Sequence, residues 1–152
     1  MRNSMLLAVC ASVATFATVA TGEVAPNEVV FTDTGAVEGS LTGVAGDPVN
    51  GAAVFKNRKK GNCLACHVNN DMLDQQFHGE IGPPLDGVAD RLIAAEMRGL
   101  LTNSKNTYDG TMMPAFYVNE GFNRVLGSFE GKTNLTAQEV EDVLAYLQTL
   151  SE

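Results

Sequence analysis

Two cysteines and a histidine stand together in Cys63-Leu64-Ala65-Cys66-His67, and this spacing constrains the fold more than any other feature of the chain. Cys63 and Cys66 lie about one helical turn apart, so their thiols can form thioethers with the two vinyl groups of one haem. The imidazole of His67 can then turn under the porphyrin and bind the iron. The segment therefore predicts one covalent haem c, around which the rest of the chain must fold.

Two other kinds of site use the same residues, and the sequence favours neither. A thioredoxin-like redox pair needs the cysteines at the start of a helix within a βαβ unit, and no such pattern surrounds Cys63. A zinc site needs four ligands. Outside the motif the mature chain offers only His78 as a further histidine or cysteine, and His67 follows Cys66 too closely for both to bind one tetrahedral ion.

The N-terminal residues predict export. Arg2 provides a positive start, residues 5–20 carry no charge, and Thr18-Val19-Ala20 ends in the small residue that signal peptidase prefers. A membrane anchor is the alternative, but the run is shorter than the roughly 20 apolar residues that span a bilayer. We therefore expect residues 1–22 to be a cleaved signal peptide and the protein to lie in a bacterial periplasm, with no membrane span. Cys10 leaves with the signal, so no disulfide is expected.

The charge of the chain limits its partners. It contains 18 Asp and Glu against 10 Lys and Arg, and loss of Arg2 leaves nine basic residues and a net charge of about −9. The negative charge therefore disfavours nucleic acid and anionic membranes as partners. Four basic residues gather just before the haem motif, where they either suit the dipole of a helix end or form a positive collar that docks an acidic partner. They are Lys56, Arg58, Lys59 and Lys60.

Helix signals in the remaining chain predict an all-α fold. Asp47-Pro48 is typical of an N-cap and first turn, and Gly61 is expected to end that helix. Asp90 is expected to cap a middle helix. Thr136 and Glu139 form a capping box for the last helix. The apolar positions that follow these two caps are Ile93, Met97, Leu100 and Leu101, and then Val140, Val143, Leu144, Leu147 and Leu150.

The segments between these helices are expected to be irregular. Residues 68–88 are rich in Asn, Gly and Pro and predict a loop. Residues 23–46 lack a clear period and predict an extended N-terminal arm, either loose or laid on a partner. Residues 47–152 then form a single domain that packs around the haem.

A second ligand for the iron is expected within Thr111-Met112-Met113-Pro114. A methionine thioether stabilises Fe(II) and closes the iron to small ligands. We predict Met113 as the ligand, because Pro114 stiffens the loop behind it. Met112 remains the near alternative.

Three other side chains are weaker candidates for that position. Met97 lies on a helical apolar stripe and is expected in the core, and Met72 lies too close to the haem motif. His78 would give a bis-histidine site of lower potential, but its polar neighbours favour a solvent-exposed loop. On the other side of the haem, the rigid Pro83-Pro84 loop is expected to offer a carbonyl to the second ring nitrogen of His67.

The order of these features resembles that of the class I cytochromes c. Three segments are more narrowly similar to the SoxX family, the monohaem cytochromes of the sulfur-oxidation system: residues 61–67, 113–117 and 135–140. The likeness covers roughly residues 47–150. It implies a class I cytochrome c fold in which the first and last helices cross, with Gly51 and Phe55 against Val143 and Tyr146.

The resemblance implies an electron-carrying subunit. SoxX cytochromes pair with a SoxA cytochrome, and this heterodimer acts as an L-cysteine S-thiosulfotransferase that joins thiosulfate to a cysteine of the carrier protein SoxYZ. The reacting centre belongs to SoxA, so no catalytic residue is expected here. The haem held by Cys63, Cys66, His67 and Met113 would pass the electrons to a soluble cytochrome c acceptor.

Two other functions remain open. A stand-alone respiratory electron shuttle would be monomeric and would lose little on removal of residues 23–46. A haem sensor or gas binder would need an open axial position, and carbon monoxide binding to the reduced protein would favour it over ligation by Met113.

Overall fold

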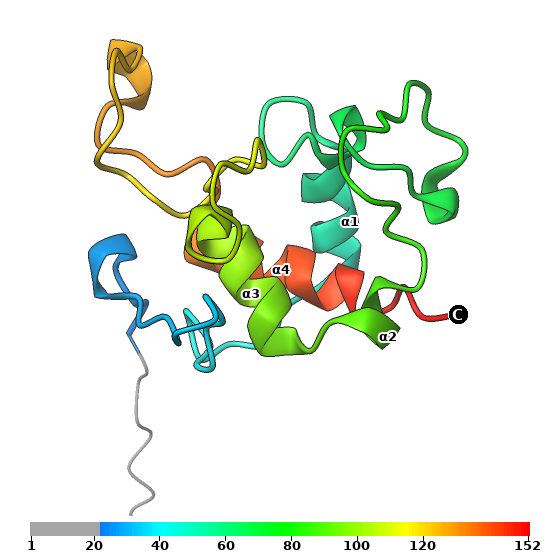
Figure 1. Ribbon diagram of the computed structural model, residues 1–152, viewed down its shortest axis with the longest axis horizontal. Coiled ribbons are helices and arrows are strands. Elements are labelled where there is room, and N and C mark those ends of the chain that lie inside the picture. The colour runs from blue at the N-terminus through cyan, green and yellow to red at the C-terminus, as the bar shows by residue number, and fades with distance from the viewer. Residues whose placement is uncertain (1–21) are drawn as a thin grey trace, which may run out of the picture.

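The computed structural model describes residues 22–152, so the predicted signal peptide lies almost wholly outside the described residues, together with Cys10. The described residues contain no strand, and the predicted all-α fold is confirmed. No helix among them is long and apolar enough to cross a membrane. Their four α-helices, labelled in Figure 1, are α1 (Pro48–Lys56), α2 (Val88–Arg91), α3 (Ala94–Asn103) and α4 (Ala137–Leu147).

Helices α1 and α4 pack closely against each other, as predicted. A Cβ atom added to Gly51 would lie 1.9 Å from the carbonyl oxygen of Asp142, so only glycine allows this approach. The rings of Phe55 and Tyr146 meet edge to face, with centroids 5.3 Å apart and planes at 65°. The carboxylate of Asp142 accepts hydrogen bonds from the Asp47 N–H (2.8 Å) and from the Asn50 side chain (2.6 Å). The start of α1 is therefore tied to the middle of α4.

The predicted N-terminal caps of α1 and α4 are confirmed. Asp47 accepts a hydrogen bond from the Val49 N–H at 2.9 Å, and Pro48 occupies the first turn of α1. Thr136 and Glu139 bond reciprocally at the start of α4, with distances of 3.2 and 3.1 Å. The predicted apolar stripe of α4 is buried, including Leu150 just beyond the helix end.

Two predicted helix boundaries are wrong. Helix α1 ends at Lys56 rather than at Gly61, because the Asn57 side chain accepts the Lys59 N–H at 2.9 Å and so favours a turn over another helical turn. Asp90 lies inside the short α2 and does not cap the middle helix. That helix, α3, begins after Ile93, whose N–H donates to the Glu96 carboxylate at 3.0 Å.

Residues 23–46 form an arm that packs on the chain's own helices, so the expectation of a loose arm is wrong. The arm doubles back on itself, with the Val24 N–H donating to the Leu41 carbonyl at 2.8 Å. Three of its apolar side chains are buried in the core against the helices. They are Ala36, Val37 and Leu41.

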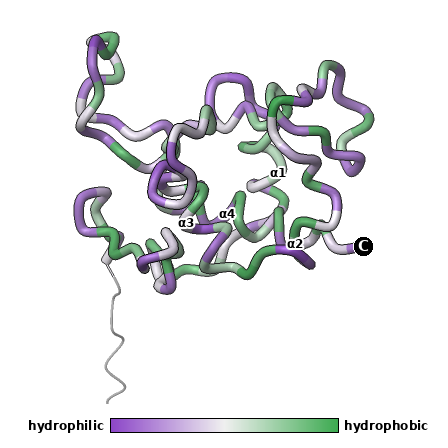
Figure 2. Tube along the Cα trace, in the orientation of Figure 1, coloured by the Kyte–Doolittle hydropathy of each residue, from purple (hydrophilic) through white to green (hydrophobic). Residues whose placement is uncertain are grey.

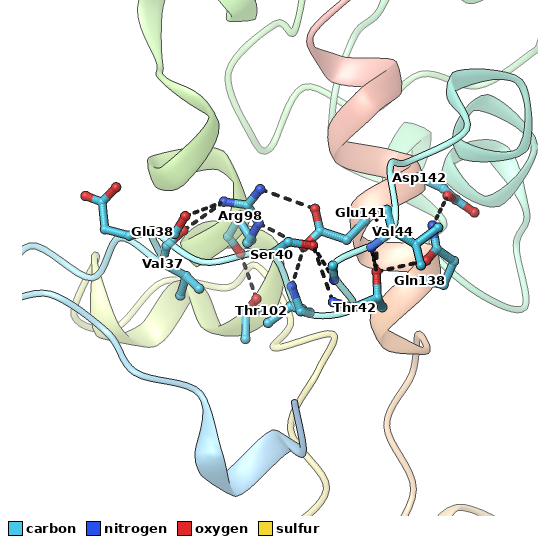
Figure 3. Close-up of polar contacts among 12 residues, drawn as sticks. Val37, Glu38, Ser40, Thr42, Val44, Arg98, Thr102, Gln138, Glu141 and Asp142 are labelled. Carbon is cyan, nitrogen blue, oxygen red and sulfur yellow. Dashed lines mark hydrogen bonds and ion pairs between the residues drawn. The ribbon is translucent and has the colours of Figure 1, made fainter. Parts of the chain in front are cut away.

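A buried ion pair fastens this arm between α3 and α4 (Figure 3). Arg98 and Glu141 share two hydrogen bonds, of 2.9 and 3.2 Å. Arg98 also donates to the Val37 carbonyl at 2.9 Å, and Glu141 accepts the Leu41 N–H at 2.7 Å. Loss of either charge would leave its partner buried and unpaired. Removal of the arm is therefore expected to destabilise the fold whether the protein is a stand-alone shuttle or a subunit. Deletion of residues 23–46 thus cannot distinguish these two functions.

Candidate haem site

Residues 57–62 connect α1 to the cysteine motif, which forms a tight turn. Its first residues make the 3-10 turn Cys63–Ala65, and the Cys63 carbonyl accepts the N–H groups of Cys66 (3.1 Å) and His67 (3.0 Å). Both thiols are half-buried and unpaired. Burial raises the pKa of the Cys63 thiol to about 12. The cysteines are therefore held one turn apart, and neither forms a disulfide.

The His67 ring is fixed by the loop that passes beside it. Its Nδ1 lies 2.7 Å from the Pro83 carbonyl oxygen, which confirms the predicted contact. Because a carbonyl can only accept, Nδ1 donates this hydrogen bond, and in the neutral ring Nε2 is then the nitrogen with a lone pair. A Cβ atom added to Gly82 would lie 2.3 Å from Cε1 of His67, so the backbone at Gly82 lies flat against the ring.

Backbone hydrogen bonds hold this loop against the motif. The N–H groups of Gly79, Gly82 and Leu85 donate at 2.8, 2.8 and 2.9 Å. Their acceptors are the carbonyls of Leu64, Cys66 and Val68, in that order. The position of the His67 ring is therefore determined mainly by the path of the chain.

The backbone of Met113 is held on both sides. Its carbonyl accepts hydrogen bonds from the Ser104 hydroxyl (2.8 Å) and from the Lys105 ammonium group (2.7 Å). Its N–H donates to the Thr111 hydroxyl at 3.2 Å. The Met113 side chain packs against the hydrophobic core, whereas Met112 is 78% exposed.

The other candidate ligands lie elsewhere. Met97 is buried in the core as predicted, and Met72 is buried there too. His78 is half-buried, so the expectation of a solvent-exposed loop residue is wrong. Its Nδ1 accepts the Asn69 N–H at 3.3 Å, and its Nε2 donates to the Met72 carbonyl at 3.2 Å. With both ring nitrogens engaged, His78 is placed as a structural residue of the loop.

The basic run before the motif divides into two parts. Lys60 forms an ion pair with Glu139 of α4. Lys56 lies in the last turn of α1 and suits its dipole, but Arg58 and Lys59 lie beyond the helix end. Lys56, Arg58 and Lys59 are exposed. The helix-dipole explanation therefore covers only the first of the four residues.

The residues that hold Met113 carry no motif in the sequence. Ser104 and Lys105 are polar residues that follow α3, yet Ser104 is buried and donates to the Met113 carbonyl. A second set of contacts without a sequence signal is a network in which the Tyr146 hydroxyl bonds Asn69 and the Asp71 carboxylate, both at 2.8 Å. No local pattern could have found these contacts, because they join residues brought together only by the fold.

No metal cluster competes with the cysteine motif in the described part of the chain. Across residues 22–152, no three His, Cys, Asp or Glu side chains are grouped to hold a metal ion.

Comparisons with known proteins place these features in a family. Residues 48–151 match the family model of cytochrome c. Among solved structures, a chain of the crystal structure of SoxXA from P. pantotrophus is 46% identical to this one, with a TM-score of 0.81. The match covers 86% of this chain and 100% of that chain. A comparison with curated proteins finds no match.

Proposed function

The chain belongs to the cytochrome c family and, within it, to the SoxX group, and on this premise we propose that it is the electron-transfer subunit of a periplasmic thiosulfate-oxidising complex. Its helical structure confirms the predicted class I cytochrome c fold. The observation that carries the proposal is the 46% identity to a SoxXA chain that is matched over its whole length.

One covalent haem c is proposed at the cysteine motif, with Cys63 and Cys66 forming the thioethers. The tight turn that holds the two cysteines one turn apart, without a disulfide between them, supports this assignment. His67 and Met113 are the proposed axial ligands. The lone pair left on His67 Nε2 and the packing of Met113 on the core fit this donor set. When bound, the haem supplies a one-electron Fe(III)/Fe(II) couple.

The residues of this chain hold and tune that couple. The hydrogen bond from His67 to the Pro83 carbonyl fixes the ring orientation and increases the basicity of the opposite nitrogen. Ser104 and Lys105 hold the Met113 backbone so that the thioether stays in place. With His67 and Met113 as its ligands, the iron would favour Fe(II) and would have a higher potential than with two imidazoles.

The proposed reaction takes place on the partner. A sulfur–sulfur bond forms between the cysteine of the carrier SoxYZ and the terminal sulfur of thiosulfate, and the thiol proton and two electrons are released. The reacting centre of this L-cysteine S-thiosulfotransferase lies on a SoxA-type cytochrome. The present chain takes the electrons one at a time and passes them to a soluble cytochrome c acceptor. It carries no catalytic residue of its own in this scheme.

We also propose the location and division of the chain. Residues 1–22 are the export signal that directs the protein to the periplasm, where the haem is attached. Residues 23–46 form the arm and residues 47–152 the cytochrome domain. The family match over residues 48–151 agrees with the start of that domain.

The first test is purification of the tagged full-length chain from the periplasm of its own organism, followed by haem staining and mass spectrometry. We expect a second c-type cytochrome in equal amount. The recovered complex, given thiosulfate and SoxYZ, should reduce added cytochrome c. Recovery of a lone monohaem protein would contradict the proposal and favour the stand-alone shuttle.

A further inference from the structure

Residues 118–134, here called the distal projection, extend away from the rest of the molecule between Tyr117 and Leu135 (Figure 1, yellow to orange). Every residue from 121 to 130 is exposed. The segment therefore adds nothing to the hydrophobic core, although it follows directly after the loop that carries Met113.

The base of the distal projection is firmly attached. The N–H groups of Phe116 and Tyr117 donate to carbonyls at the end of α3, at 3.2 and 3.1 Å, and the Leu135 N–H donates to the Phe116 carbonyl at 3.0 Å. Near the tip, the Phe129 N–H donates to the Leu126 carbonyl at 2.7 Å within a 3-10 turn. The base of the projection is therefore fixed against the end of α3, directly after the loop that carries Met113.

The tip of the projection is apolar. Phe122, Leu126 and Phe129 are 52%, 69% and 53% exposed, and Val125 lies among them with 40%. Figure 2 shows hydrophobic residues, in green, at this tip. Single exposed apolar side chains are ordinary, but a gathering of four large ones within eight residues marks an interaction surface.

The projection also carries no net charge, although the chain as a whole is at −8. Its two acidic residues, Glu120 and Glu130, are balanced by Arg124 and Lys132. Residues 68–88 also expose apolar side chains, including Phe77, but they contain four acidic residues and no Lys or Arg. Covering the projection therefore removes less uncompensated charge from water than covering that loop.

This chemistry fits a permanent partner better than a transient one. Permanent interfaces are more hydrophobic, whereas transient redox encounters are small. Charge speeds the encounter of partners that must also separate. The projection continues the loop that carries Met113, so a partner bound to it would meet this chain on the side where that loop ends, which suits electron exchange with the proposed haem. A second copy of this chain bound at the projection would be an acceptor of the same kind and could not supply the electrons.

We propose that the distal projection is the docking element through which this chain binds the second c-type cytochrome of its complex, with Phe122, Leu126 and Phe129 buried in the interface. This inference rests on the proposed function. The exposed basic residues Arg58 and Lys59 are left outside this contact, free for a soluble acceptor.

The test compares the tagged full-length chain with its Phe122→Ser/Leu126→Ser variant, both purified from the periplasm of the organism. The amount of second cytochrome recovered per chain is read from haem-stained gels, and the affinity is read from titration of the separated subunits. Loss of two central apolar anchors is expected to weaken the complex roughly 100-fold. Thermal unfolding of the isolated variant should match that of the wild type, because both side chains are exposed.

The matched control is Phe77→Ser, which removes a phenylalanine that is 81% exposed outside the projection. It should recover the second cytochrome as the wild type does. Equal recovery by the double variant would overturn the docking surface while leaving the proposed function intact. A wild-type chain that recovers no second cytochrome would overturn both.

The same experiment also tests two other possible occupants of the surface. A wild-type homodimer that becomes monomeric in the double variant would assign the surface to a second copy and overturn the inference. Recovery of the wild type in the membrane fraction, lost in the double variant, would assign the surface to lipid and would also overturn it.

Discussion

The His67 side and the Met113 side of the site are held by different means. His67 lies between the Pro83 carbonyl and the flat backbone at Gly82, in a loop fastened to the motif by backbone hydrogen bonds. Met113 is held by the side chains of Ser104 and Lys105, and its loop continues into the exposed distal projection. Backbone contacts thus fix the position of the His67 ring, whereas side-chain contacts fix the position of Met113, so single substitutions can change the latter.

The largest effect is expected on the histidine side, from Gly82→Ala. The new Cβ would lie 2.3 Å from Cε1 of His67 and must displace the ring from the Pro83 carbonyl. We expect a loss of about 3 kcal/mol in unfolding free energy and a lower haem content, measured by denaturation and by the haem spectrum. Gly39→Ala is the control, because nothing lies within 4 Å of its added Cβ. A Gly82→Ala variant with wild-type stability would show that the backbone at Gly82 does not fix the position of the His67 ring.

Replacement of the methionine ligand should leave the fold standing but change the iron. Met113→Ala is expected to lose the weak far-red band of methionine-bound ferric haem and to bind carbon monoxide when reduced, at a stability cost of about 2 kcal/mol. Met112→Ala should keep the band, because Met112 is exposed. The opposite pattern would assign the ligand to Met112.

A smaller effect is expected from Ser104→Ala, which removes one of the two donors to the Met113 carbonyl. The far-red band should survive, but imidazole should displace the thioether about fivefold more easily, which corresponds to about 1 kcal/mol for a lost hydrogen bond. Titration with imidazole measures this. Ser128→Ala, an exposed serine of the distal projection, is the control. An unchanged imidazole affinity would mean that the Ser104 hydroxyl does not hold the ligand loop.

The smallest effect is expected in the acid stability of the α1–α4 joint that supports the histidine side. Burial raises the pKa of Asp142, but hydrogen bonds from the Asp47 N–H, Asn50 and Gln138 outweigh it and lower the pKa below 3.8. Stability from this carboxylate is fully present above pH 3.8 and is lost as the pH falls through the lower pKa of the folded state. The free energy of unfolding, measured by denaturation at several pH values, should therefore fall less steeply with decreasing pH in Asp142→Asn than in the wild type. An unchanged dependence of the unfolding free energy on pH in the acid range would contradict this linkage.

Local features of this fold were predictable from the sequence. Asp47 and Thr136 cap their helices as expected, because capping depends on residues within one turn. The crossing of α1 and α4 at Gly51 and Phe55 was predictable because the sequence resembles the class I cytochromes c, whose first and last helices cross. The Pro83 carbonyl was also foreseen, because a histidine ligand needs an acceptor and the rigid loop lies close in sequence.

Other features could not be read from the sequence. Asp90 resembled a helix cap, but its carboxylate accepts the Glu152 N–H at the far end of the chain, at 2.7 Å. The arm gave no periodic signal, because it is held by Arg98 and Glu141 rather than by regular structure of its own. His78 looked solvent-exposed among polar neighbours, yet its ring bonds the backbone of the loop on both sides.

The sequence by itself determined the cysteine motif, the caps of the first and last helices and the all-helical class, since each depends on neighbours along the chain. Only the tertiary structure decided how the arm is fastened, which of two adjacent methionines packs on the core and which apolar loop is left exposed without net charge. The physical reason is that these depend on burial and hydrogen bonds between distant residues, and such contacts exist only after the chain has folded.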